Sequence, residues 1–452
     1  MRLTQATDLM DTKAPMIKSL TALFAFCVFG TAFAADNRVD TVRFDAPELA
    51  QFGDLDIGVR TLEVTDPGRP DILKTVNGGD TLYYDRTLTV EVWYPARLSD
   101  GQSPGGSYTT PTRNPNITAT LYGRAVRDAA PLTVDEPLPL VIVSHGYPGN
   151  RFLMSHLAEN LASKGYVVAS IDHRDSTYRD QQAFASTLYN RPLDQLVVID
   201  EIESLSTSDE SFLYAMVDAQ QTGIVGYSMG GYGLTINLGG GVSDALVNHA
   251  IAPANKLAFE HAASNPDFLA TRDRRIKAGF LVAPWGMAND VWLEGDLGSI
   301  SAPTFWLSGS ADDVAGYEQG TRRMFENALN SDRYLLTYLN AGHNAGAPIP
   351  LPVEFESSDD KQGADHYVDA VWDSIRMNNV MDHFATAFFD LHLKGDASKR
   401  EYLRLLPNSE AGVYSVVDDA PTDEHTYWKG FPPSTARGLL LEYLEATTIS
   451  AD

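Results

Sequence analysis

The sequence predicts an α/β fold in which a mostly parallel central sheet is flanked by helices. From residue 138 onward, short apolar segments alternate with segments of helical periodicity, which is typical of βαβ units. The apolar segments are continuous, as expected for strands that are buried on both faces. The chain has 452 residues, 44% hydrophobic and 21% charged, which predicts one large domain with additions, or two domains.

The strands and helices of this sheet can be placed from their patterns. The expected strands cover residues 139–144, 166–171, 223–227, 277–284, 303–309 and 333–340. Helices are expected at 151–164 and 380–395, where apolar side chains recur at helical spacing and a glycine ends or follows the segment. Together with a polar, helix-prone insertion near 172–222, these elements form a catalytic core at 136–395.

Additions flank this core on both sides. Residues 35–135 are expected to form an N-terminal extension with the first strands of the sheet, because 87–95 alternates polar and apolar side chains. Within it, residues 99–131 are rich in Gly, Pro, Ser and Thr, which predicts a long surface loop. Residues 396–452 form an acidic C-terminal extension.

The N-terminus has the features of a secretory signal peptide. Lys18 precedes the apolar run 20–34, which ends in the small-x-small triplet Ala32-Phe33-Ala34. This run is shorter than the roughly 20 residues of a membrane span, so residues 1–34 are predicted to be removed. The one cysteine, Cys27, lies inside this segment. We therefore expect a periplasmic or extracellular protein without disulfides or a cysteine nucleophile.

The formal net charge of −26 argues against a nucleic-acid partner, because an acidic surface repels phosphate groups. It does not identify a substrate. The acidic stretch 357–365 has a carboxylate spacing that matches no known calcium loop, so solvated surface is the favoured interpretation over a calcium site. We expect no metal and no organic cofactor.

The stretch "GIVGYSMGG" contains the motif G-x-S-x-G at residues 226–230, directly after an apolar strand and before a segment that can be helical. A strand that turns at once into a helix forces strained backbone angles on the central serine, and glycines two residues away avoid collisions with neighbouring elements. The motif therefore predicts Ser228 as a nucleophile at a helix N-terminus.

A serine nucleophile requires a base and a carboxylate, in this type of sheet in the chain order Ser, Asp, His. Asp312 follows the strand that ends at Gly309, and His343 follows the next strand, so both are expected at the edge where Ser228 lies. Asp313 is the alternative acid, but the Gly-x-x-Asp spacing favours Asp312.

Of the other histidines, His173 and His366 lie in loops and remain competitors of His343 for the role of base. His145 precedes a glycine in a turn and is interpreted as structural. His156, His383 and His392 fall in expected helices as surface or packing residues.

Acyl transfer also needs donors for the negative charge that develops on the carbonyl oxygen. The turn "SHGYPGN" at 144–150 leaves the first core strand near the predicted nucleophile. We expect the backbone N–H of Tyr147 to pair with that of Met229, the residue after the serine.

The segments "VEVWYPA", "VIVSHGYPG", "GIVGYSMGG", "SGSADD" and "NAGHN" follow one another in an order that resembles the α/β-hydrolase superfamily. Within it, the chain resembles predicted dienelactone hydrolases and platelet-activating-factor acetylhydrolases, with local similarity to cutinase-type polyester hydrolases through "GYSMGG" and "APW". The cutinase resemblance implies Trp285 and Tyr147 as substrate-contacting aromatics, although Trp285 at a strand end is equally explained by packing. Dienelactone hydrolases carry a cysteine where this chain has Ser228.

The sequence thus predicts a secreted serine esterase in which Ser228, His343 and Asp312 form the triad. A polyester hydrolase, a lipase or phospholipase, and a peptidase use the same triad chemistry and remain alternatives. A non-catalytic binding protein on the same scaffold is the last alternative. Acyl and alcohol specificity are not readable from the chain.

Overall fold

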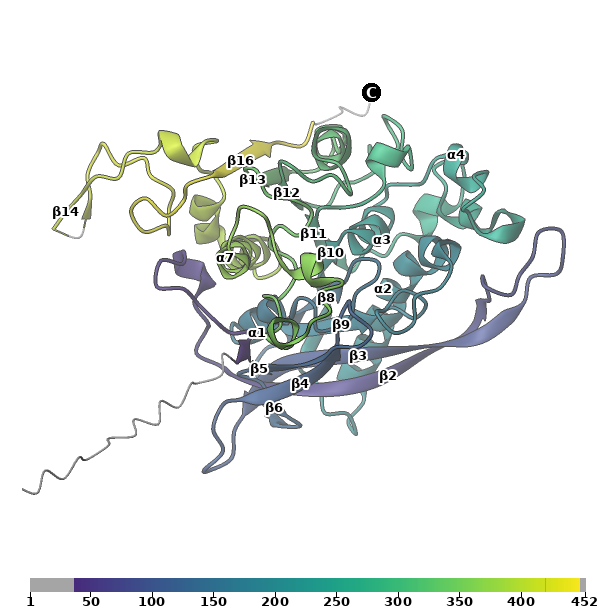
Figure 1. The fold of residues 1–452 in the computed structure, drawn as a ribbon, viewed down its shortest axis with the longest axis horizontal. Coiled ribbons are helices and arrows are strands. Elements are labelled where there is room, and N and C mark those ends of the chain that lie inside the picture. The colour runs from purple at the N-terminus through teal and green to yellow at the C-terminus, as the bar shows by residue number, and fades with distance from the viewer. Residues whose placement is uncertain (1–35, 419, 448–452) are drawn as a thin grey trace, which may run out of the picture. The chain divides into compact units, whose positions relative to one another are not determined.

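The computed structural model describes residues 36–418 and 420–447, and its main element is a sheet of eleven strands (Figure 1). The six central strands pair in parallel, whereas strands beside them at both sides pair antiparallel. In spatial order the strands are β16 (Leu439–Leu444), β13 (Arg333–Tyr338), β12 (Thr304–Gly309), β11 (Ile276–Val282), β10 (Val217–Tyr227), β8 (Leu138–Ser144), β9 (Val167–Asp172), β3 (Tyr83–Arg97), β2 (Asp56–Pro70) and β6 (Val126–Arg127), with β7 (Ala130–Pro131) paired to β3.

Helices cover both faces of this sheet, which confirms the predicted fold class. Helices α1 (Ser155–Ala162) and α7 (Ser374–His392) lie on one face, and α2 (Phe184–Thr207) and α3 (Met229–Asn237) lie on the other (Figure 1). Successive residues of β8 alternate between the two hydrophobic clusters, because side chains along a strand point to opposite faces. Both faces are therefore buried, which explains the uninterrupted apolar runs.

The shorter elements surround this three-layered arrangement. They are β1 (Asn37–Arg38), β4 (Gly106–Pro111), β5 (Thr118–Gly123), α4 (Asp244–Val247), α5 (Arg323–Asn327), α6 (Glu354–Ser357), β14 (Val416–Val417) and β15 (Ala420–Pro421).

The predicted surface loop at 99–131 is wrong. Strands β4 and β5 form an antiparallel hairpin there, and β1 adds a third strand beside β5. Tyr108, Ala119 and Leu121 are buried in the hydrophobic cluster that also contains α1. The alternation of these buried positions is present in the sequence, but the high Gly, Pro, Ser and Thr content of the segment obscured it.

The predicted helix at 151–164 begins four residues late, because residues 151–154 form a turn. The backbone N–H of Arg151 donates to Asp172 and that of Phe152 donates to the Asn150 side chain. Side-chain acceptors thus satisfy these N–H groups outside the helix. The other predicted strands match β8 to β13 within a few residues, except that β10 begins at Val217, six residues before the predicted start. The predicted C-terminal helix at 380–395 corresponds to α7, which begins six residues earlier, at Ser374, and ends at His392.

The C-terminal extension contributes a strand to the main sheet. Strand β16 pairs antiparallel with β13 and buries Leu439 and Leu441. Because an unpaired strand edge is open to association with other chains, β16 protects β13 from such contacts.

The predicted signal peptide at 1–34, with Cys27, lies outside the described residues. Among the residues that are described, no helix combines the length and the apolar character needed to cross a membrane.

Helix α7 carries two histidines whose side chains face the protein interior. Burial, together with the charge of Lys164, lowers the pKa of His383 to about 3. Burial also lowers the pKa of His392 to about 4, with Asp332 opposing and Arg400 reinforcing the shift. Nε2 of each ring has no hydrogen-bond partner among the described residues. Both imidazoles are therefore neutral in the folded protein at neutral pH.

We predict that replacing His392 by Phe makes the fold less sensitive to acid. The unfolded chain binds a proton at this position near pH 6.5 and the folded chain only near pH 4, so wild-type stability falls as pH falls through that window. Between pH 7.5 and pH 5, the free energy of unfolding of His392→Phe should therefore fall by about 1 to 2 kcal/mol less than that of wild type. Urea denaturation at the two pH values measures this difference. The exposed His249, changed to Gln, is the control; an equal pH response in both variants would contradict the prediction.

Candidate active site

Ser228 occupies the turn between β10 and α3 in a backbone conformation that residues other than glycine rarely adopt. Its φ of 53° and ψ of −113° lie in a strained region. A Cβ atom at Gly226 would lie 2.5 Å from the carbonyl oxygen of Gly230, and one at Gly230 would collide with the carbonyl oxygen of Ser144. The two glycines of the motif are therefore required by close packing of the strand, the helix and the neighbouring β8.

The side chain of His343 connects Ser228 to Asp312. Nε2 of His343 lies 3.0 Å from Oγ of Ser228, and Nδ1 lies 3.0 and 3.1 Å from the two carboxylate oxygens of Asp312. Asp312 follows β12 and His343 follows β13, whereas Ser228 follows β10. These strands are parallel, so their carboxyl ends bring the three residues to one edge of the sheet.

Asp312 is held in its ionised form. Its burial alone would raise the pKa, but hydrogen bonds from His343 and from the backbone N–H groups of Ala315 and Val314 outweigh this effect and lower the pKa below 3.8. Asp313, the alternative acid, is exposed and makes no hydrogen bond to His343 among the described residues. The geometry thus favours Asp312 as the partner of the histidine.

The two backbone groups expected to stabilise an oxyanion flank the serine. Neither the N–H of Tyr147 nor that of Met229 donates a hydrogen bond to another described residue. Met229 is the first residue of α3, where N–H groups have no partner within the helix. A Cβ atom at Gly146 would lie 3.3 Å from Cβ of Ser228, so the turn that carries Tyr147 lies directly against the nucleophile.

A pocket of about 320 Å³ opens over Ser228 and His343. Tyr147, a predicted substrate contact, is part of its wall, and Arg113 from the β4–β5 turn and His366 line another part. Trp285, the second predicted contact, is absent from the described residues that line this pocket. Its ring instead packs at 5.3 Å, in an edge-to-face arrangement, on Phe184, which in turn contacts Tyr147. The backbone N–H of Trp285 donates to the carbonyl oxygen of Ser228.

The remaining histidines are packed away from the nucleophile or lack a contact with it. His145 accepts the backbone N–H of His173 and packs against its ring. His156 in α1 lies 3.1 Å from Asp382 of α7. His366 lines the pocket, but burial and the charge of Arg113 lower its pKa to about 3.

The acidic stretch 357–365 ends at the pocket, where Asp365 forms part of the wall. Its carbonyl oxygen accepts a hydrogen bond from Asn344, the residue after His343. In residues 36–418 and 420–447, no cluster of three or more His, Cys, Asp or Glu side chains is arranged to hold a metal ion.

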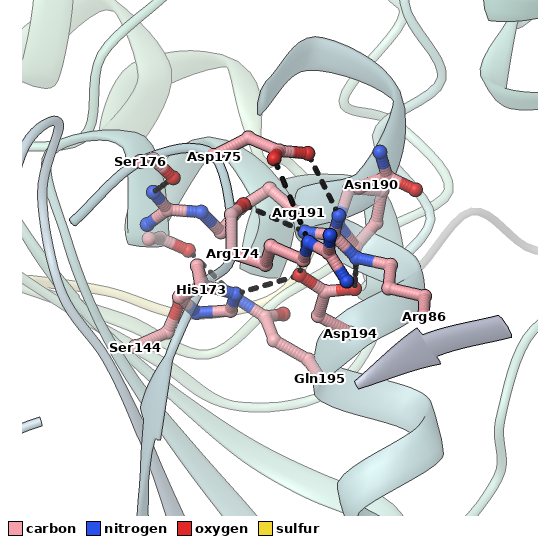
Figure 2. Close-up of polar contacts among 12 residues, drawn as sticks. Arg86, Ser144, His173, Arg174, Asp175, Ser176, Asn190, Arg191, Asp194 and Gln195 are labelled. Carbon is pink, nitrogen blue, oxygen red and sulfur yellow. Dashed lines mark hydrogen bonds and ion pairs between the residues drawn. The ribbon is translucent and has the colours of Figure 1, made fainter. Parts of the chain in front are cut away.

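Ser144, His173 and Asp194 form a second series of serine, histidine and aspartate side chains, which the sequence analysis did not find (Figure 2). Oγ of Ser144 lies 2.8 Å from Nε2 of His173, whose Nδ1 lies 3.0 Å from Asp194. Asp194 also accepts two hydrogen bonds from Arg86. The sequence offers only a weak signal for it, the charged residues Arg191 and Asp194 on either side of Pro192 and Leu193, and the structure shows both of them buried in α2.

Comparison with known proteins gives a family match that covers the Tyr147 turn and the serine motif. The sequence profile of the family "Platelet-activating factor acetylhydrolase, isoform II" matches residues 108–230. The chain has the α/β-hydrolase fold of these esterases. The resemblance predicted from the sequence, including its acetylhydrolase and cutinase components, is thereby confirmed.

Two curated proteins to which this chain is similar have names of ester-cleaving enzymes. The platelet-activating factor acetylhydrolase of Cavia porcellus is 40% identical over 78 residues, which is 16% of this chain and 18% of the relative. The cutinase est1 of Thermobifida alba is 25% identical over 206 residues, which is 45% of this chain and 53% of the relative. The chain thus spans between one fifth and about half of the length of these two relatives.

A solved structure shows the same fold over most of the chain. The ferulic acid esterase from Streptomyces cinnamoneus superposes with a TM-score of 0.54 at 20% sequence identity, covering 91% of this chain and all of the other. At this identity the likeness concerns the fold alone.

We predict that Asp312→Asn slows phosphonylation of Ser228 by a fluorophosphonate by about three to four orders of magnitude, because an amide stabilises the wrong histidine tautomer. The far-downfield proton resonance of the Asp312–His343 hydrogen bond should disappear in the same variant. Labelling rates followed by intact mass, together with proton NMR, measure both effects.

Asp313→Asn is the matched control for this test. An exposed charge contributes about 1 kcal/mol or less, so the labelling rate should change by about fivefold at most and the downfield resonance should remain. The reverse pattern would assign the acid to Asp313.

Proposed function

We propose that this protein is a serine carboxylic-ester hydrolase that acts through an acyl-enzyme intermediate. The observation that carries the proposal is the hydrogen-bonded series from Ser228 through His343 to Asp312. In the proposed reaction, Nε2 of His343 takes the hydroxyl proton while Oγ of Ser228 attacks the ester carbonyl carbon. Asp312 fixes the histidine tautomer and stabilises the imidazolium that forms.

The carbonyl oxygen becomes negative in this step, and the unpartnered N–H groups of Tyr147 and Met229 are the proposed donors to it. His343 then gives its proton to the leaving alcohol, which departs and leaves an acyl group on Ser228. A water molecule, deprotonated by the same histidine, releases the acid and restores the hydroxyl. These steps need no metal and no organic cofactor.

The size and polarity of the pocket support a small, partly polar ester as substrate. Its volume of about 320 Å³ is at the lower end of the range for small-molecule sites. The charged side chains of Arg113, Asp313 and Asp365 line it, so a long hydrocarbon chain finds few apolar partners there.

A polyester hydrolase is the second candidate, supported by the similarity to the Thermobifida alba cutinase over 45% of this chain. In this reading, the aromatic row of Tyr147, Phe184 and Trp285 beside the pocket would hold the polymer. Trp285 is partly exposed but does not line the pocket in the described structure, so the polymer would have to extend beyond the pocket to contact it.

Secretion is part of the proposal and rests on the sequence of residues 18–35. Removal of the segment ending in Ala32-Phe33-Ala34 would give a mature chain that begins at Ala35.

We predict that wild-type protein hydrolyses p-nitrophenyl acetate with a burst of p-nitrophenol and that Ser228→Ala reduces kcat by about 10⁶-fold, to the background left by binding alone. Stopped-flow absorbance and the mass of the trapped acyl-enzyme measure the two effects. Full esterase activity in Ser228→Ala, with unaltered folding by circular dichroism, would refute the assignment.

We predict that kcat/KM falls as the acyl chain grows, by about tenfold or more between acetyl and octanoyl esters, because the pocket is small and polar. A panel of p-nitrophenyl esters, the corresponding anilides and an amorphous polyester film measures this preference. Rapid release of acids from the film, with slow turnover of the short esters, would favour the second candidate instead.

A further inference from the structure

Arg191 lies in α2, is almost completely buried, and contacts the turn that carries Tyr147 (Figure 2). Its Nη1 donates to the carbonyl oxygen of His145. Its Nη2 donates to the carbonyl oxygen of Gly146 at 3.3 Å and to Oγ of Ser176 at 2.7 Å. Within the described part of the chain, no carboxylate forms a salt bridge with Arg191. The guanidinium thus donates to two backbone carbonyl groups and one hydroxyl group. Nδ1 of His145 lies 2.6 Å from the same Gly146 oxygen, so Arg191 and His145 hold this carbonyl group together.

The position of these carbonyl groups determines where the neighbouring N–H groups point. In a trans peptide unit the C=O and the N–H lie on opposite sides, and both the His145–Gly146 and Gly146–Tyr147 bonds are trans. With Arg191 behind the two carbonyl oxygens, the N–H groups of Gly146 and Tyr147 face the opposite side. Gly146 and Tyr147 line the pocket next to Ser228.

Arg191 also affects the strength of the Tyr147 donor. A hydrogen bond to a peptide carbonyl polarises the peptide unit and strengthens the donor capacity of its N–H. This effect is large when the bond comes from a charged group in a buried environment. Burying a cation without a carboxylate partner is costly, so the contact is expected to have a function beyond packing.

We propose that Arg191 is a positioning residue for the oxyanion hole: it orients and polarises the Gly146–Tyr147 peptide so that the Tyr147 N–H binds the developing oxyanion. This inference rests on the proposed esterase function. Arg191 touches neither the substrate nor the reacting atoms and acts through the peptide alone.

Arg86 provides a matched control in the same buried network. Its guanidinium donates to both carboxylate oxygens of Asp194, to Asp175 and to the carbonyl oxygen of Arg174. No described hydrogen bond connects Arg86 to the carbonyl groups of His145 or Gly146. Replacing Arg86 therefore disturbs the network without releasing the oxyanion peptide.

The test compares Arg191→Lys and Arg191→Met with Arg86→Lys in the full chain. For the Arg191 variants we expect kcat for p-nitrophenyl acetate to fall by about 10- to 100-fold with KM almost unchanged, since complete loss of an oxyanion donor costs about 10²- to 10³-fold. The infrared carbonyl stretch of the acyl-enzyme should shift to higher frequency, because the carbonyl is less polarised. Hydrogen exchange of the segment around Tyr147 should accelerate.

Arg86→Lys should lower the melting temperature while leaving kcat within about threefold of wild type and the carbonyl stretch in place. A purely structural Arg191 would instead lower the melting temperature without moving the carbonyl stretch, and that result overturns the inference. If Arg191→Met does not fold, Arg191→Lys decides, because lysine keeps the charge but cannot bridge two carbonyl groups in the same way. An inactive wild type would overturn the proposed function itself, whereas an active wild type with unchanged Arg191→Lys kinetics overturns only this inference.

Discussion

The strained backbone of Ser228 is the constraint on which the arrangement of the site depends. A non-glycine residue with positive φ persists only where its surroundings determine its conformation fully. Here the N–H of Ser228 donates to Val282 of β11, and its carbonyl oxygen accepts from the N–H groups of Tyr232 and Trp285. The turn is thus fixed to the next strand, to its own helix and to the loop after β11.

Residues that directly follow strands could be predicted from the sequence, whereas residues positioned by long-range contacts could not. Ser228, Asp312 and His343 each follow a strand directly, so motif spacing and chain order were enough to bring them to one edge of the sheet. The β4–β5 hairpin was missed because its turn-forming residues outnumber the alternating apolar ones, and its burial depends on contacts with α1, far along the chain. Arg191 was missed because its partners are backbone carbonyl groups, which leave no pattern in side-chain types.

The second series of Ser144, His173 and Asp194 shows that such a constellation is not in itself a catalytic site. Its distances of 2.8 and 3.0 Å resemble those at Ser228. However, burial and the charge of Arg191 lower the pKa of His173 to about 3, so the imidazolium that general-base catalysis requires is strongly disfavoured. Ser144 is fully buried, whereas Ser228 borders a pocket. Its lack of solvent access and the lowered pKa of His173 set this buried series apart from the proposed triad at Ser228.

Segments that surround the triad form the walls of the pocket, and the triad itself does not determine their composition. The common α/β scaffold supports many chemistries, and specificity lies in the segments that surround the nucleophile. In this chain the β4–β5 turn contributes Arg113 to the pocket, and the segment after β13 contributes Asp365 and His366. The hydrogen bonds of Asn344 to the carbonyl oxygens of Asp365 and Val368 tie that second wall to the residue next to His343. The hairpin wall is in turn tied to the second wall, because the backbone N–H of Arg113 donates to the hydroxyl of Tyr367. A change in the hairpin that alters substrate preference is therefore expected to reach the segment next to His343 as well.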